Sequence, residues 1–185
     1  MFSLRVDDEL VIELAEMWHA QEIYDLVDRN REHLRPWMPW EPLTTSVADT
    51  TSFLTSVRAE YAAGRQFHAN LRYGGTLVGA IGMPSIDRAN RTGEIGYWLG
   101  AEHTGRGIMT RATAALTTAA FREMGLHRVA IAADVANARS RAVPERLGFT
   151  FEGVLRGNKV VHGRSVDHAW YGMLEHDWDA GTLPG

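Results

Sequence analysis

Apolar and polar residues follow two periods along this chain, one typical of strands and one typical of helices. Short apolar runs bounded by glycine or charged residues predict strands, and apolar residues three and four positions apart predict helices. The predicted strands are Leu10–Leu14, Gln66–Tyr73, Thr76–Met83, Gly93–Leu99, His127–Val135, Phe149–Leu155 and Val166–Leu174. The predicted helices are His19–Leu34, Ser46–Ala63, Gly107–Met124 and Ala138–Leu147.

Glycine and proline mark the boundaries between these elements. The pair Gly74-Gly75 predicts a hairpin. Three prolines in Arg35–Pro42 end the first helix and stiffen a loop that also holds two tryptophans and a methionine. The order β-α-α-β-β-β-α-β-α-β-β predicts an α/β (α+β) fold, which we expect to be one domain over residues 1–185, with a right-handed crossover at the long helix.

The segment from Glu94 to Phe121 is the most informative part of the chain. It places Gly105-Arg106-Gly107 between an apolar strand and the start of the long helix. First-turn amides of a helix lack intrahelical partners, and glycine lets a phosphate approach the backbone closely. This pattern predicts a site for a nucleotide-type cofactor, although an ordinary turn into a helix has the same residues. It is neither a Walker loop nor a GxGxxG fingerprint.

Composition excludes several other classes of protein. The 185 residues are 45% hydrophobic and 23% charged with a net charge of -4, which is typical of a soluble globular protein and disfavours nucleic acid as a partner. The chain has no cysteine, which excludes disulfides and a thiol nucleophile, and its eight histidines show no metal-ligand spacing. With no signal-peptide pattern and no long apolar run, we expect a cytoplasmic protein without metal or membrane contact.

Three motifs in a fixed order resemble one known family. They are LRPWMPW, then EIGYWLG with GRGIMT, then NARSRAVPERLGFTFEG. Together they resemble the GNAT superfamily of acetyl-CoA-dependent N-acetyltransferases, and within it the bacterial ribosomal-protein serine/alanine N-terminal acetyltransferases. The resemblance implies a mixed, mostly antiparallel sheet with flanking helices and a V-shaped cleft between the fourth and fifth predicted strands. Acetyl-CoA would lie in that cleft, and the acceptor would enter from the opposite side.

The same resemblance implies which residues bind acetyl-CoA. The strand backbone would pair with the pantetheine arm, the glycine loop would bind the pyrophosphate, and an asparagine would hold the arm. The implied residues are Trp98, Leu99, Thr104, Gly105, Arg106, Gly107, Ile108, Met109, Thr110, Asn137 and Ser140. Two positions depart from the family pattern: Thr104 replaces a Gln or Arg, and Pro144 replaces a tyrosine acid.

Ser140 and Glu94 are the candidate catalytic residues. The resemblance implies that Ser140 is the acid that protonates the leaving thiolate, although this serine also suits a helix cap. An α-amine with a pKa near 8 is roughly a quarter neutral at pH 7.5, so it needs only a weak base. Glu94 is the first candidate for that base, with a solvated strand-end charge as its alternative, and Glu41 is the second. Lys159 stands where some members of the family have a glutamate.

The proline-rich loop supplies the candidate acceptor-binding residues. They are Trp37, Met38, Trp40 and Glu41, and core packing is the alternative role for the apolar three. His162 and His168 lie on the last predicted hairpin and are expected to have structural roles.

The predicted function is acetyl transfer to an amine, by direct attack and without an acyl-enzyme. The resemblance favours the α-amine of a protein N-terminus, a ribosomal protein above all, and allows a homo-oligomer. One alternative is an acetyltransferase for a small amine such as an antibiotic, a polyamine or an amino acid. The other is a non-catalytic acyl-CoA-binding module.

Overall fold

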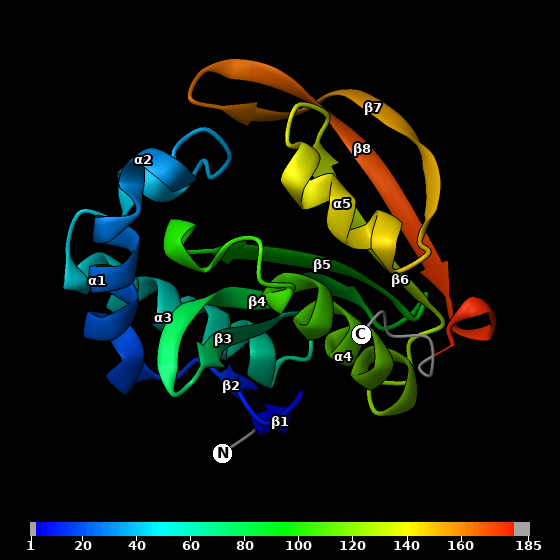
Figure 1. Ribbon diagram of the computed structural model, residues 1–185, viewed down its shortest axis with the longest axis horizontal. Coiled ribbons are helices and arrows are strands. Elements are labelled where there is room, and N and C mark those ends of the chain that lie inside the picture. The colour runs from blue at the N-terminus through cyan, green and yellow to red at the C-terminus, as the bar shows by residue number, and fades with distance from the viewer. Residues whose placement is uncertain (1–2, 180–185) are drawn as a thin grey trace.

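The computed structural model describes residues 3–179, and its strands form an eight-stranded sheet in the order β1-β2-β3-β4-β5-β6-β8-β7 (Figure 1). Neighbouring strands pair antiparallel, except that β5 and β6 pair parallel. The strands are β1 (Ser3–Arg5), β2 (Leu10–Leu14), β3 (Phe67–Tyr73), β4 (Thr76–Asp87), β5 (Thr92–Leu99), β6 (Arg128–Asp134), β7 (Thr150–Val161) and β8 (Arg164–Leu174). The predicted mixed, mostly antiparallel sheet is confirmed.

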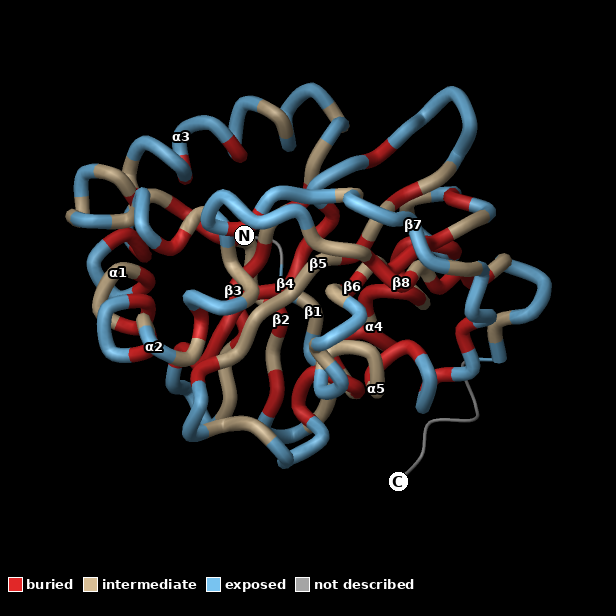
Figure 2. The backbone as a smooth tube through the Cα atoms, turned by 90° about the horizontal axis from the view of Figure 1, so that it is seen from above, coloured by how far each residue is buried: buried red, intermediate tan, exposed pale blue. Residues whose placement is uncertain are grey.

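Helices cover both faces of the sheet. They are α1 (Ala20–Arg29), α2 (Arg31–Leu34), α3 (Val47–Ala62), α4 (Ile108–Arg122) and α5 (Ala138–Arg146), with 3-10 turns at Met17–His19, Glu41–Leu43, Ala101–His103 and Glu175–Asp177. The larger core packs α4 and α5 against one face, and a smaller core packs α1 and α3 against the other. Figure 2 shows the buried residues concentrated in the central strands between these layers. None of the helices within residues 3–179 is long and apolar enough to cross a membrane.

Several predicted elements differ from the structure, and β4 continues to Asp87, four residues beyond the predicted end at Met83. The first helix breaks at Asn30, whose side chain donates to the Leu26 carbonyl and accepts from the Ala101 amide, so it ties the helix end to the far end of β5. The short strand β1 has too few residues for a periodic signal and was not predicted. Strand β7 continues six residues beyond Leu155 because its hairpin with β8 extends to the turn at His162.

Strands β5 and β6 separate after a short paired region. Their parallel ladder joins Thr92–Ile95 to Arg128–Ile131 and ends there. Beyond it, β5 continues to Leu99 paired only with β4, and β6 continues to Asp134 paired only with β8. This is the predicted V-shaped opening. It leaves the β6-facing backbone groups of Gly96–Leu99 without a partner strand.

Strand alternation assigns the β5 side chains to the two layers. Ile95, Tyr97 and Leu99 face the core beneath α4, whereas Trp98 packs against the core beneath α1 and α3. Glu94 and Gly96 share the face of Trp98. The opening between β5 and β6 therefore connects a face covered by α4 and α5 to a face covered by α1 and α3.

Candidate active site

The loop before α4 is an open cradle built on two glycines. Gly105 and Gly107 have φ values of 77° and 69°, in the left-handed region that favours glycine. A Cβ added at either glycine would meet no atom within 4 Å among the described residues, so the space in front of the first turn of α4 is free. The first-turn amide N–H groups project from the N-terminus of α4 into this space, and a helix N-terminus favours an anion. A pyrophosphate fits this cradle.

The residues around these glycines hold the cradle in place. Ile108 and Met109 are only 1% and 9% exposed, so their side chains anchor α4 in the core and leave only their backbone for a ligand. Thr104 donates its hydroxyl to the Ala101 carbonyl at 2.8 Å, and Arg106 donates to the Glu102 carbonyl at 3.2 Å. In this structure both side chains stabilise the loop.

At the start of α5, Asn137 and Ser140 lie beside the opening. Asn137 caps the helix, since its side-chain oxygen accepts from the Ser140 amide at 3.1 Å. The Ser140 carbonyl accepts from the Tyr97 hydroxyl at 2.9 Å, and burial raises the pKa of Tyr97, which keeps that phenol protonated. The Ser140 hydroxyl has no hydrogen bond within residues 3–179, and the residue lines the cavity described next.

A cavity of about 560 Å³ joins the predicted acceptor residues to this helix start. The predicted residues on its wall are Trp37, Met38, Trp40, Glu94, Trp98, Asn137 and Ser140. Trp40 and Trp98 contact each other with ring centroids 5.8 Å apart at 57°, so the loop and the strand share one aromatic wall. Both aromatic side chains are only half-buried, which means that they pack together and still face the cavity.

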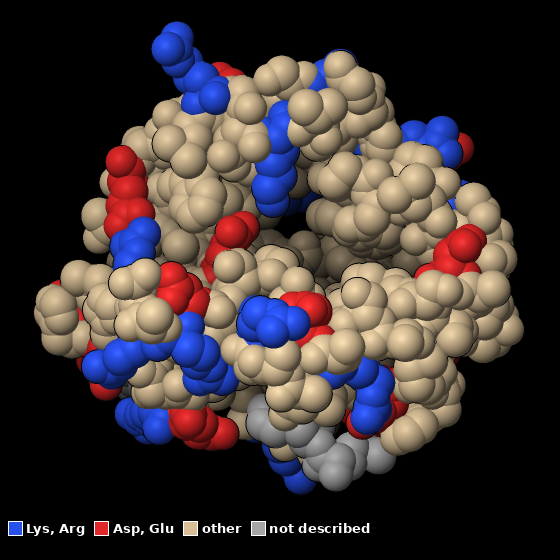
Figure 3. Space-filling view, turned by 180° about the vertical axis from the view of Figure 1, so that it is seen from behind, with Lys and Arg blue, Asp and Glu red and all other residues tan. Residues whose placement is uncertain are grey.

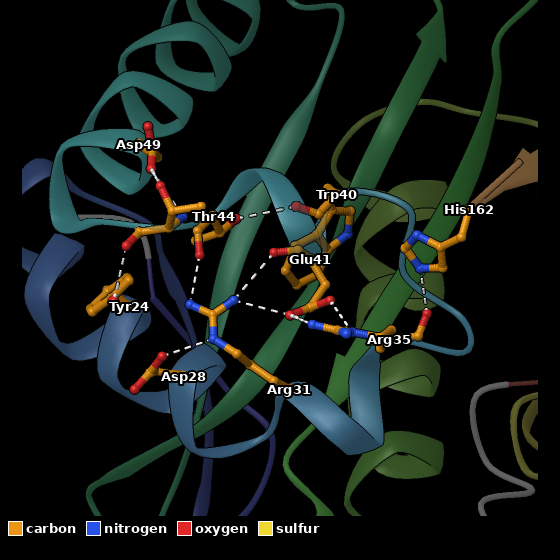
Figure 4. A network of polar contacts seen from close by, with 10 residues as sticks. Tyr24, Asp28, Arg31, Arg35, Trp40, Glu41, Thr44, Asp49 and His162 are labelled. Atoms are coloured by element: carbon orange, nitrogen blue, oxygen red, sulfur yellow. Dashed lines mark hydrogen bonds and ion pairs between the residues drawn. The ribbon is translucent and has the colours of Figure 1, made fainter.

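Glu41 has a different place from the other predicted loop residues. It is fully buried, and its carboxylate accepts from Arg31 and Arg35 at 3.0 Å each (Figure 4). Arg31 also binds the Thr44 carbonyl and Asp28. Glu41 therefore stabilises the loop and is no longer a candidate base.

The ion pairs decide the charge state of Glu41. Burial alone would raise the pKa of this carboxyl. The hydrogen bonds and positive charges of Arg35 and Arg31 outweigh that effect and hold the pKa below its usual range. Glu41 is ionised at neutral pH.

The β7–β8 hairpin closes the cavity on the side opposite α3. The ring of His162 donates to the Arg35 carbonyl at 2.6 Å, so the hairpin tip contacts the C-terminal end of α2 (Figure 4). Lys159 and His168 line the cavity, and Lys159 forms no ion pair with any described residue. Burial, together with the charge of Lys159, lowers the pKa of His168. Seen from behind the view of Figure 1, the surface is hollowed near its centre, with basic and acidic side chains at the rim (Figure 3).

Comparison with known proteins identifies the family. A family model described as an acetyltransferase (GNAT) domain matches residues 10–150. This chain belongs to the GNAT acetyltransferase family. It is 39% identical over 181 residues to the protein named "Putative ribosomal N-acetyltransferase YdaF" of Bacillus subtilis strain 168, a match that covers 97% of this chain and 98% of that protein.

Solved structures of two acetyltransferases are similar to this one over nearly the whole chain. The ribosomal L7/L12 α-N-protein acetyltransferase RimL, in complex with coenzyme A, has a TM-score of 0.91 at 26% identity over 96% of this chain and all of that one. The microcin C7 self-immunity acetyltransferase MccE, in complex with acetyl-CoA and AMP, has a TM-score of 0.89 at 30% identity over 92% and 95%. As a GNAT enzyme, the chain is an acyltransferase with acetyl-CoA as its acetyl donor.

Some residues that line the cavity were not predicted from the sequence. Thr50 and Phe53 on α3, and His68 and Asn70 on β3, line the same cavity. Burial lowers the pKa of His68 to about 4, so its imidazole is neutral at pH 7. The available signal was the alternation of polar His68 and Asn70 with apolar neighbours, which marks a polar face on an otherwise buried strand.

We predict that Glu41→Gln destabilises the fold at neutral pH. The neutral amide loses both ion pairs and leaves two guanidinium groups beside it. The expected loss of unfolding free energy is roughly 2–3 kcal/mol, less than for a fully buried pair because Arg35 is 62% exposed. Urea unfolding at pH 7 measures it. Glu60→Gln, at an exposed pair with Arg65, is the control and should leave the unfolding midpoint unchanged.

The pH dependence of this loss is a second readout. A carboxyl with a lowered folded-state pKa stabilises the fold above its unfolded pKa, and this contribution disappears as the pH falls through the folded pKa. The difference between wild type and Glu41→Gln should therefore shrink below about pH 4. A constant difference from pH 7 to pH 3 would show that Glu41 acts by packing alone.

Proposed function

We propose that this enzyme acetylates the N-terminal α-amine of a protein, with a ribosomal protein as the favoured acceptor. The observation that carries the proposal is the continuous cavity, which runs from the α1/α3 face through the opening between β5 and β6 to Ser140. Its volume of about 560 Å³ is within the range of sites that hold ligands larger than a simple amine. The names of YdaF and RimL, which match nearly the whole chain, support the same acceptor class.

The donor-side residues hold acetyl-CoA largely through their backbone. In this proposal, the unpaired edge at Trp98 and Leu99 binds the pantetheine arm, and the amides from Thr104 to Thr110 bind the pyrophosphate. Asn137 and Ser140 lie at the end of the opening where the arm would end. When bound, acetyl-CoA supplies an acetyl group activated as a thioester.

Two side chains on opposite sides of the opening are the proposed proton acceptor and proton donor of the reaction. Glu94 is on the acceptor face and accepts, through water, the proton that the attacking amine loses. Ser140 holds a proton on its free hydroxyl, ready for the departing sulfur. A backbone N–H on the unpaired edge of β5 polarises the carbonyl. An α-amine needs no stronger base than Glu94 because roughly a quarter of it is already neutral near pH 7.5.

An acetylation assay tests the proposed acceptor. The enzyme is incubated with acetyl-CoA and a mixture of ribosomal proteins, beside a panel of small amines and aminoacyl nucleotides, and products are identified by intact mass and peptide mapping. We expect one added acetyl group at a protein N-terminus. Acetylation of small amines or nucleotides alone, in line with the AMP complex of MccE, would replace the proposal with a small-molecule function. Binding of acetyl-CoA without any product would indicate the non-catalytic module.

We predict that Gly107→Glu weakens coenzyme A binding roughly 100-fold, because a carboxylate in the cradle repels the pyrophosphate at short range. Isothermal titration calorimetry measures the affinity. Gly75→Glu is a matched control: Gly75 has a similar φ of 81° and equally open surroundings, but it lies in the β3–β4 turn. Equal affinities for the two variants would contradict the cradle assignment.

We predict that Ser140→Ala lowers kcat by about 100-fold, the low end of the range for a general acid, with little change in coenzyme A affinity. The substitution keeps both backbone hydrogen bonds of Ser140, so the cap and the Tyr97 contact remain. Steady-state kinetics measure the effect, and Ser140→Thr, which retains a hydroxyl, should recover part of the rate. An unchanged kcat in Ser140→Ala would remove this residue from the chemistry.

A further inference from the structure

Two buried polar side chains at the α3 end of the cavity have no hydrogen-bond partner. The Thr50 hydroxyl and the Asn70 amide nitrogen are both unpaired within the described chain, and these residues are only 3% and 1% exposed. Buried polar atoms are nearly always hydrogen-bonded, because leaving them unpaired costs free energy. Since both residues line the cavity, a ligand there is a ready source of the missing partners.

The packing of α3 on β3 puts both residues on the wall of one cavity. Phe53 lies over His68, edge to face, with ring centroids 4.9 Å apart. Thr50 lies about one turn before Phe53 on α3, and Asn70 lies two residues after His68 on the same face of β3. Thr50 and Asn70 therefore flank this contact on the two elements. Their groups are neutral, and each can donate and accept a hydrogen bond.

The distance from this pair to the opening matches a short length of peptide. Asn70 pairs with Ala80, and Ala80 pairs with Trp98, so two strand spacings, about 10 Å, separate Asn70 from the edge of β5. An extended peptide advances about 3.3 Å per residue. An acceptor whose amine lies at β5 therefore places its third residue, with the peptide groups on either side of it, near Asn70. The parallel row from His68 crosses two glycines, Gly82 and Gly96, which contribute no side chain of their own.

The cavity also has an exit beyond the pair. Leu43 and Phe53 line it and yet are 74% and 44% exposed, so they stand where the cavity meets solvent. A chain that enters at the opening and crosses the sheet can leave between the 41–44 turn and α3. Exposed apolar side chains at that point are suited to contact with a passing polypeptide.

We propose that Thr50 and Asn70 form a subsite for the acceptor's main chain, hydrogen-bonding the peptide groups on either side of its third residue. The inference rests on the proposed function, since it requires a peptide acceptor. Neutral peptide groups match the neutral donors and acceptors of the subsite. The subsite therefore distinguishes a peptide from a single amino acid, and it does so independently of the peptide's side chains.

A length series of acceptors tests the subsite. The series has one N-terminal residue in common and runs from the amino-acid amide through the dipeptide and tripeptide amides to the tetrapeptide amide. For the wild type, kcat/KM should rise up to the tripeptide. Thr50→Val and Asn70→Leu, which keep the shape and remove the polar atoms, should each lose about 3- to 10-fold on the tripeptide and tetrapeptide, mainly in KM. The amino-acid amide should react equally with all three enzymes.

A matched control separates this role from a structural one. Thr113 on α4 also has a buried, unpaired hydroxyl but does not line the cavity, so Thr113→Val should leave the whole length series unchanged. Thr50→Val and Asn70→Leu should melt at the wild-type temperature or above, because each replaces an unpaired polar group with an apolar one. A lower melting temperature with equal losses at every length would overturn the subsite in favour of a structural role.

The failure of the subsite and the failure of the proposed function give different results. If the wild type acetylates peptides and both variants keep its length dependence, only the subsite is overturned. If the wild type acetylates small amines and none of the peptides, the proposed function fails, and the subsite fails with it.

Discussion

The separation of β5 and β6 is the constraint on which the site depends. Four residue pairs hold the strands together, and the ladder ends at Ile95 and Ile131. On the other side of β5, the pairing with β4 shifts register between Gly82 and Ser85, next to Pro84, which has no amide to donate. A bulge increases local twist, so it turns the second half of β5 away from β6. One irregularity thus opens the cleft, exposes a backbone edge and connects the two faces of the sheet.

A second set of interactions holds the walls of the cavity around that opening. Arg35 is shared by two of them: its guanidinium binds the buried carboxylate of Glu41, and its carbonyl accepts from His162 at the hairpin tip. The proline-rich loop and the β7–β8 hairpin, which are distant in sequence, are therefore fixed to the same residue. Because Arg31 binds the same carboxylate, α2 and the aromatic loop form one rigid unit against which Trp40 and Trp98 pack.

The sequence was sufficient for the features that local patterns encode. Strand periodicity, the Gly74-Gly75 turn and the glycines before α4 predicted most of the strands, the β3–β4 hairpin and the cradle, whereas the mixed sheet and its cleft followed from the family resemblance. It was insufficient where a contact joins remote elements. Glu41 became a candidate base because nothing local shows that Arg31 and Arg35, one turn apart, enclose it. Thr50 and Asn70 were not predicted because their place on one cavity wall depends on how α3 packs on β3, which the periodicity of the sequence does not show.

In the proposed site, donor and acceptor are bound by different parts of the fold, and this affects how such an enzyme can evolve. The proposed donor-side contacts come mostly from backbone groups of β5 and the turn before α4, which are set by the fold and tolerate many side chains. The proposed acceptor-side contacts come from side chains on α3, β3 and the proline-rich loop, which line the cavity. Substitution in the second set leaves the first intact. Selection can therefore change what is acetylated while the source of the acetyl group stays the same.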